Sequence, residues 1–188
     1  MDHSITAPID GLRRDHARMR SVLTLIAHQL DKLETTGTGD YVLLANALYY
    51  MRKFPSQVHH PKEDAIFDHL MARDPTYAKE VQRIREQHME IYEMEEWLVE
   101  MALHEPKPHT TDLRKLIDFG RHYLQLQREH CRAEETMLFP RAGEALTKHD
   151  WAQVSHVVKD VEDPLFGKHR QERFQSLYDY IMRESDGA

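Results

Sequence analysis

The sequence is almost without cysteine. Its 188 residues include one cysteine, Cys131, which excludes an internal disulfide and a zinc site built from cysteine thiolates. No apolar run approaches the roughly 20 residues that a membrane-spanning helix needs. The opening residues, MDHSITAPID, lack the basic and then apolar profile of a signal peptide. These absences predict a cytoplasmic protein with no membrane partner.

Positive charge is also scarce. The chain has 25 lysine and arginine residues against 32 aspartate and glutamate residues, a formal net charge of −7. Proteins that bind nucleic acid usually present a basic surface, so the composition argues against a nucleic-acid partner. No nucleophile triad, phosphate-binding loop or nucleotide fingerprint is apparent, and any catalysis would therefore belong to a bound metal. The unusual number is that of histidine, which occurs 14 times.

Apolar residues recur at spacings of three and four along four long segments, the pattern of helices that bury one face. The first segment begins near Asp10. The second covers about residues 41–71, with a kink expected near Pro55. The third begins at Pro75, and the fourth is expected to end at Pro140. No segment shows strand-like alternation, so the chain is predicted to be all-α.

Two shorter helices are expected after the fourth segment. One begins near Thr147, which is spaced from Asp150 like a capping box. The other carries the apolar residues Phe174, Leu177 and Ile181. The economical architecture is an up-down four-helix bundle with additional C-terminal helices. Residues 1–145 would form the bundle, and residues 146–188 a C-terminal helical extension packed on it.

Each long segment also carries histidine or glutamate on its apolar stripe. These residues are His16, His59, Glu63, His88, His130 and Glu134. Helix positions four apart lie within about 40° of each other, so His59 with Glu63, and His130 with Glu134, each present an imidazole and a carboxylate to one place. In an antiparallel bundle the four segments bring these side chains to a comparable depth.

Imidazoles and carboxylates inside an apolar core are costly unless a partner satisfies them. The stripes hold no lysine or arginine that could pair with the acids. Two metal ions would satisfy both kinds of group. Imidazole and carboxylate ligands suit iron, manganese or zinc, and bridging glutamates suit a pair of ions. The sequence therefore predicts a dinuclear metal site.

The second segment leaves its histidine ligand ambiguous. His60 adjoins His59, and a slipped helix would pair His60 with Asp64 instead. We favour His59 because Glu63 completes its stripe.

Two further residues near the stripes are interpreted as supporting groups. Cys131 lies about 100° off the stripe of His130, so we interpret it as a packing residue. Glu95 lies on the third stripe, two turns beyond His88, and we interpret it as a supporting or partly solvated acid.

Four motifs carry a family resemblance. RDHARM (residues 14–19), HHPKEDAIF (59–67), EQHMEIY (86–92) and HCRAEETMLFP (130–140) resemble, in order, the helix motifs of the hemerythrin-like family, also called the HHE cation-binding domain. The resemblance covers about residues 10 to 145. It implies a four-helix bundle with a non-haem centre of two iron ions joined by an oxo or hydroxo bridge. The implied ligands are His16, His59, Glu63, His88, His130 and Glu134, with both glutamates bridging.

One position separates the chain from the oxygen carriers of that family, and a second leaves a choice of ligand open. The carriers have a second histidine four residues after the one in the third helix, where this chain has Tyr92. Tyr92 is left with three roles: ligand, hydrogen-bond donor to a bound oxygen species, or packing residue. The carriers also use a five-residue separation in the fourth helix, which would select Glu135, whereas helical geometry favours Glu134. Because Tyr92 replaces a histidine ligand of the carriers, the resemblance does not imply simple reversible oxygen carriage.

Two functions are consistent with the sequence. The first is a di-iron protein that binds a small oxidant (O2, NO or H2O2) for sensing, storage or detoxification. The alternative is iron handling, such as iron–sulfur cluster repair or iron-responsive regulation. A purely structural bundle is disfavoured because the buried acids would have no organic partner. Manganese and zinc remain alternatives to iron, and a homodimer remains open.

Overall fold

The structure, a computed structural model, describes residues 7–157 and 161–186. This part of the chain consists of helices and connecting loops and contains no strand, which confirms the predicted all-α class. None of the helices within it has the length and apolarity that crossing a membrane requires.

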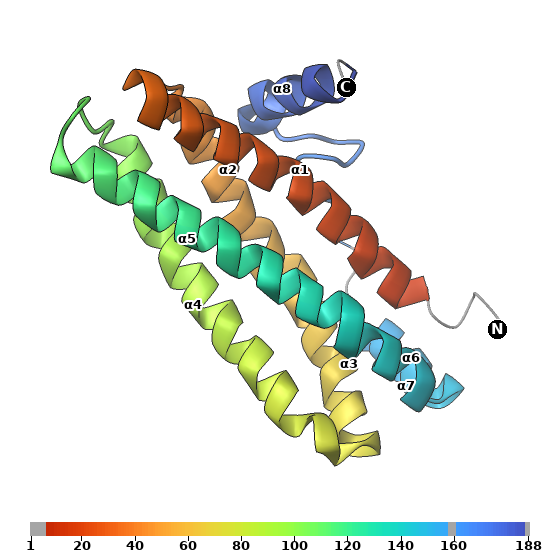
Figure 1. Cartoon of the computed structure of the whole chain (residues 1–188). Helices are drawn as coiled ribbons and strands as arrows, with labels where there is room; N and C mark the ends of the chain where they lie inside the picture. Colours follow the sequence, from red (N-terminus) through yellow and green to blue (C-terminus); the bar gives the residue numbers. More distant parts are fainter. Residues whose placement is uncertain (1–6, 158–160, 187–188) are drawn as a thin grey trace.

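Four long rods form the body of the molecule (Figure 1). The first rod is α1 (Ala7–Thr36), and the third is α4 (Ala78–Leu103). The second rod joins α2 (Tyr41–Phe54) to α3 (His60–Arg73), and the fourth joins α5 (Thr111–Ala133) to α6 (Phe139–Ala145). Helix α1 packs on α2 and α5, and α4 packs on the same two helices. Short loops make consecutive rods antiparallel, so the up-down bundle is confirmed.

A wide π-helical turn joins the two helices of the second rod and again those of the fourth. In Pro55–His59 the turn closes when the amide of His60 donates to the carbonyl of Pro55. Proline follows directly, at Pro61, in the first turn of α3. The kink expected near Pro55 is therefore a widened turn, which accommodates the missing proline donor without breaking the rod.

The prediction that Pro140 ends the fourth helix is wrong, because a second π-helical turn precedes this proline. In the turn Glu134–Leu138, the amide of Phe139 donates to the carbonyl of Glu134. Pro140 then lies in the first turn of α6, where no amide donor is needed. The rod continues to Ala145 as a result.

Some helix ends lie where the sequence predicts them, and others do not. Helix α1 begins at Ala7, so Asp10 lies in its first turn and is not its cap. Pro8 explains the earlier start, because proline is well suited to the first helical turn. The capping box before α7 (Lys148–Val157) is confirmed: Asp150 accepts from the Thr147 amide at 2.8 Å, and Thr147 Oγ1 accepts from the Asp150 amide at 3.3 Å.

A polar layer divides the core into two apolar clusters. On α1, Leu12 belongs to one cluster, Met19 belongs to the other, and His16 lies between them. On α4 the same order holds for Ile84, His88 and Ile91. Because all four rods contribute to both clusters, each rod crosses the polar layer once, at its predicted metal-ligating residues.

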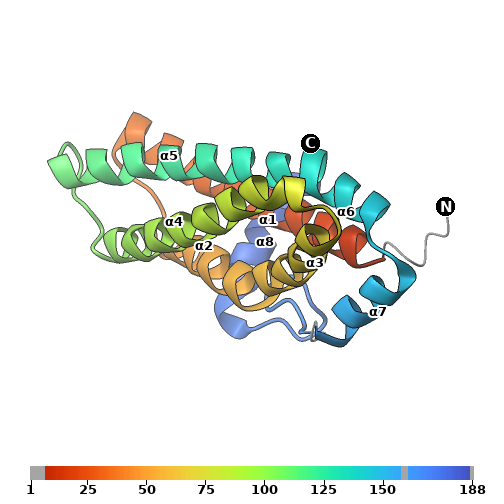
Figure 2. The same cartoon turned by 90° about the horizontal axis from the view of Figure 1, so that it is seen from below.

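The C-terminal helices pack on the bundle at two places (Figure 2). Helix α7 contacts α3, where Trp151 and Val154 join the smaller cluster. Helix α8 (Gln175–Asp186) contacts α1 and α2, where Leu177 and Ile181 join the larger cluster. We propose on these contacts that residues 146–188 are an extension of a bundle formed by residues 1–145.

Candidate metal centre

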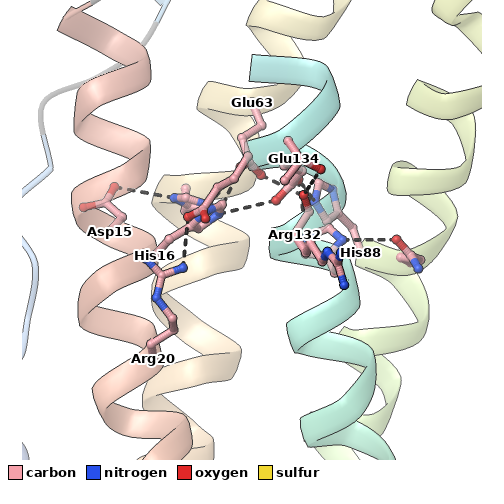
Figure 3. A network of polar contacts seen from close by, with 12 residues as sticks. Asp15, His16, Arg20, Glu63, His88, Arg132 and Glu134 are labelled. Carbon is pink, nitrogen blue, oxygen red and sulfur yellow. Dashed lines mark hydrogen bonds and ion pairs between the residues drawn. The ribbon is translucent and has the colours of Figure 1, made fainter. Parts of the chain in front are cut away.

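The polar layer brings together ligand-type side chains from all four rods (Figure 3). The six predicted ligands lie on α1, on the two π-turns, on α3, on α4 and at the end of α5. His16, Glu63 and Glu134 each have 0% exposure. In Figure 3, Glu63 and Glu134 lie between His16 on one side and His88 on the other. The two glutamates therefore occupy the middle of the centre.

Glu63 presents its two oxygens to different histidines. Its Oε1 lies 2.9 Å from Nε2 of His59 and 3.6 Å from Nε2 of His16. Its Oε2 lies 3.5 Å from Nε2 of His88. One carboxylate thus spans two groups of imidazoles.

Glu134 spans the same two groups. Its Oε2 lies 3.4 Å from Nε2 of His16. Its Oε1 lies 3.3 Å from Nε2 of His130 and 3.7 Å from Nε2 of His88. We call the position between His16 and His59 the A side, and the position between His88 and His130 the B side. Each glutamate has one oxygen on each side, an arrangement suited to bridging two ions.

The inner atoms of the centre lack partners within the described residues. The Nε2 atoms of His16, His59 and His88 are buried and make no hydrogen bond. The same holds for both carboxylate oxygens of Glu63 and of Glu134. Even the 2.9 Å approach of His59 to Glu63 is not aligned as a hydrogen bond. Leaving such groups unsatisfied costs about 1–3 kcal/mol each, more when they are charged. Cations with nitrogen and carboxylate ligands would satisfy them, and iron, manganese and zinc all accept this donor set.

The pKa shifts of the centre also indicate a site suited to cations. Burial raises the pKa of Glu63, but His59 and His16 outweigh this and hold it well below the ordinary range. Burial lowers the pKa of His88, but Glu134 and Glu63 outweigh this and raise it to about 9. With no cation present, protons on the imidazoles balance the carboxylates. A divalent cation would take over that role, since a metal binds neutral imidazole.

Two polar residues orient imidazoles of the centre from outside, and a third lies close to His59. The outer nitrogen, Nδ1, of His16 lies 2.9 Å from Glu135 Oε1, and that of His130 lies 3.3 Å from Gln87 Oε1. The Nδ1 of His59 lies 3.5 Å from Asp15 Oδ2 without making a hydrogen bond. A partner on Nδ1 directs the lone pair of Nε2 inward, and such contacts raise metal affinity.

These outer partners were not predicted from the sequence as supporting groups. Asp15 and Gln87 directly adjoin His16 and His88 in the chain, but neighbours on a helix face different directions. Each lies next to a histidine of another rod, so only the packing of the rods reveals the contact. For Glu135, the sequence offered a choice with Glu134. The structure turns Glu134 inward and places Glu135 behind His16.

His60 also reaches the centre. Its ligand nitrogen lies within 4.8 Å of ligand atoms of Glu63, His88 and His130. The sequence presented His59 and His60 as alternatives, whereas the structure brings both to the polar layer. The pairing of His60 with Asp64 is absent, because Asp64 accepts a 3.0 Å bond from Arg85.

Cys131 is buried as expected of a packing residue, but it is not surrounded by apolar groups alone. Its sulfur lies within 4.8 Å of ligand atoms of His16 and Glu134. Burial raises the pKa of the thiol, although the nearby His16 imidazole opposes this shift. A protonated thiol therefore lies next to the A side.

Tyr92 and Glu95 lie outside the centre. The Tyr92 hydroxyl accepts a 3.0 Å bond from Arg52, whose guanidinium stacks over the ring. Of its three roles, packing with a hydrogen bond is the one observed. Glu95 is 1% exposed and accepts from the Tyr123 hydroxyl at 2.7 Å. Burial raises the pKa of Glu95 to about 8, so it is a buried supporting acid.

The chain was compared with models of protein families, with curated proteins and with solved structures. The family model for the hemerythrin HHE cation binding domain matches residues 7–142, which include every residue of the centre. No curated protein and no solved structure matched the chain. Since the match covers more than half of the chain, this protein belongs to the hemerythrin HHE cation-binding domain family.

Proposed function

We propose that the chain holds two iron ions, one on the A side and one on the B side, and binds a small oxidant there. The candidate oxidants are O2, NO and H2O2, and the role is sensing, storage or detoxification. The observation that carries this proposal is the placement of Glu63 and Glu134, each with one unsatisfied oxygen on each side. Carboxylates placed this way neutralise part of the charge of two cations at once.

The residues of the chain supply the positions and the environment. His16, His59, Glu63, His88, His130 and Glu134 would hold the ions. Reduced iron would supply electrons and an open coordination position to the oxidant. The apolar clusters on both faces of the polar layer limit the entry of water, and Phe139 stacks on His16 with ring centroids 5.6 Å apart.

Metal content tests this proposal directly. The chain is purified without chelator, loaded anaerobically with iron(II), desalted and analysed by mass spectrometry for metals. We expect two irons per chain and, after mixing with air or peroxide, the near-ultraviolet absorption of a coupled di-iron(III) pair. Saturation at zero or one iron contradicts the proposal. Parallel loading with manganese and zinc tests the other metals, and retention of zinc alone after purification would exclude iron.

Iron handling is the second candidate, favoured by a separate observation. The unsatisfied ligand atoms lie in the core between the two clusters, so the stability of the fold should depend on iron, as an iron-responsive regulator requires. Limited proteolysis with and without iron distinguishes this role. Equal resistance in the two states would exclude regulation through metal-coupled folding.

A further inference from the structure

Cys131 lies at the edge of the metal centre and not within the apolar core. Its side chain is 5% exposed and belongs to the last turn of α5, shortly before the π-helical turn that begins at Glu134. It is part of neither apolar cluster. Its sulfur lies within 4.8 Å of ligand atoms of His16 and Glu134. The polar layer therefore contains a thiol beside its imidazoles and carboxylates.

The two groups next to the sulfur present unsatisfied atoms to the centre. Nε2 of His16 and Oε2 of Glu134 lie 3.4 Å apart, and neither makes a hydrogen bond. Both side chains are fully buried. Buried polar atoms without partners indicate a bound species between them. An oxidant that reacts with an ion at these atoms does so beside the sulfur of Cys131.

Helix geometry explains how the sulfur reaches this position. Cys131 is three residues before Glu134, and positions three apart are neighbours on the face of a helix. His130 directly precedes Cys131 but lies about 100° around the helix, and its Nε2 lies 3.3 Å from the other oxygen of Glu134, Oε1. Two adjacent residues of α5 thus approach one carboxylate from different directions.

Burial and the lack of a second thiol decide what oxidation of Cys131 would require and produce. A buried cysteine is ordinarily inert, because the thiolate is the nucleophile and apolar surroundings disfavour it. Its oxidation therefore requires an oxidant held in the centre. A sulfenic acid condenses with a second thiol to form a disulfide, but this sequence has no second cysteine. A sulfenic acid at Cys131 would therefore persist after the oxidant is gone.

We propose that Cys131 is a site of oxidation by hydrogen peroxide, where the thiol becomes a sulfenic acid when iron occupies the centre. This inference rests on the proposed di-iron function. In the reaction, sulfur forms a bond to one oxygen of the peroxide as the O–O bond breaks. Sulfur loses two electrons, the peroxide gains them, and the thiol proton joins the departing hydroxide to give water. The ion would supply Lewis-acid chemistry to the peroxide. Cys131 thus records exposure to peroxide.

The test compares a buried thiol with an exposed one in iron-loaded chains. The wild type has Cys131, whereas the double variant Cys131→Ser, Met89→Cys has its thiol at a position that is 63% exposed in the wild type. Both receive equimolar hydrogen peroxide without air and then catalase. Denaturation in dimedone traps sulfenic acid, and mass spectrometry of the digest locates it. We expect Cys131 to be labelled at least about tenfold faster than the exposed thiol, because reactants held side by side react faster.

Two further measurements check the dependence on iron and the persistence of the product. Circular dichroism and iron per chain should show that the double variant is as helical as the wild type and retains two irons. In the metal-free wild type, provided that circular dichroism shows it folded, labelling of Cys131 should be slower than that of the exposed thiol. Delaying dimedone after catalase should leave the labelling of iron-loaded Cys131 unchanged.

The outcomes separate this inference from the proposed function. If the wild type binds two irons and Cys131 is labelled no faster than the exposed thiol, or equally fast with and without iron in the folded chain, Cys131 is not the site and the di-iron proposal still stands. Labelling that disappears during the delay would contradict a lasting record. If the wild type binds fewer than two irons, the proposed function fails, and the role of Cys131 fails with it.

Discussion

Glu135 holds His16 from outside the centre: its Oε1 lies 2.9 Å from Nδ1 of His16 and accepts a bond of the same length from Arg20. The contact joins α1 to the fourth rod. Because Nδ1 is engaged, Nε2 of His16 is the nitrogen left to face Glu63 and Glu134.

The first prediction concerns this contact. Glu135→Ala should leave the fold intact and lower iron affinity about 10–100-fold, the usual effect of removing a group that orients a ligand. Competition with a chelator measures the affinity. Glu144→Ala is the control, since Glu144 is an exposed acid of the same rod whose partner among the described residues is Arg141. Equal iron affinity in the two variants would show that Glu135 does not orient His16.

Glu63→Ala should cost the chain at least one of its two irons, because it removes one oxygen from each side. Iron per chain after anaerobic loading is the measurement. The matched control is Asp64→Ala, the next residue, whose carboxylate faces Arg85 instead of the centre. A Glu63→Ala chain that keeps both irons would remove this residue from the ligand set.

Glu95 should make stability fall as pH rises. Its folded pKa, raised by burial to about 8, lies above the ordinary value of 4.5, so the folded state binds the proton more tightly than the unfolded state. The stabilisation is fully present below the ordinary pKa and is lost progressively up to the folded pKa. Between about pH 6 and about pH 8 the loss is on the order of 2 kcal/mol.

Urea unfolding of the metal-free chain across this range measures the effect. Glu95→Gln keeps a group that can accept from Tyr123 but cannot titrate, so its stability should depend less on pH than that of the wild type. Glu93→Gln, which changes an exposed acid of the same helix, should behave like the wild type. Parallel pH profiles for the wild type and Glu95→Gln would contradict the raised pKa.

Leu177 tests how firmly the C-terminal extension is attached. Leu177 is 0% exposed in the larger apolar cluster, so Leu177→Ala should destabilise the chain by about 2–5 kcal/mol. Met182→Ala removes a 38% exposed side chain of the same helix and should change stability little. Iron per chain should stay at two in both variants, because α8 supplies no residue of the centre. Equal unfolding curves would mean that α8 contributes no packing energy to the bundle.

Local pattern accounts for most of the fold. Spacings of three and four place Leu12, His16 and Met19 on one face of one helix, and a four-residue separation places His130 under Glu134. Such relationships depend only on the helical repeat, which is the same in every helix. The ends of helices are predicted less accurately from local pattern. Pro140 predicts the end of a helix, but a π-helical turn before it lets the rod continue.

The sequence by itself determined the helices, their buried faces and the polar residues on those faces, because these follow from a periodicity of a few residues. Only the tertiary structure decided which atoms meet. Whether His60 faces the B side, whether Cys131 faces the A side and which acid stands behind His16 depend on how the rods are rotated and shifted against one another. That arrangement is set by packing between residues far apart in the chain, which no local spacing encodes.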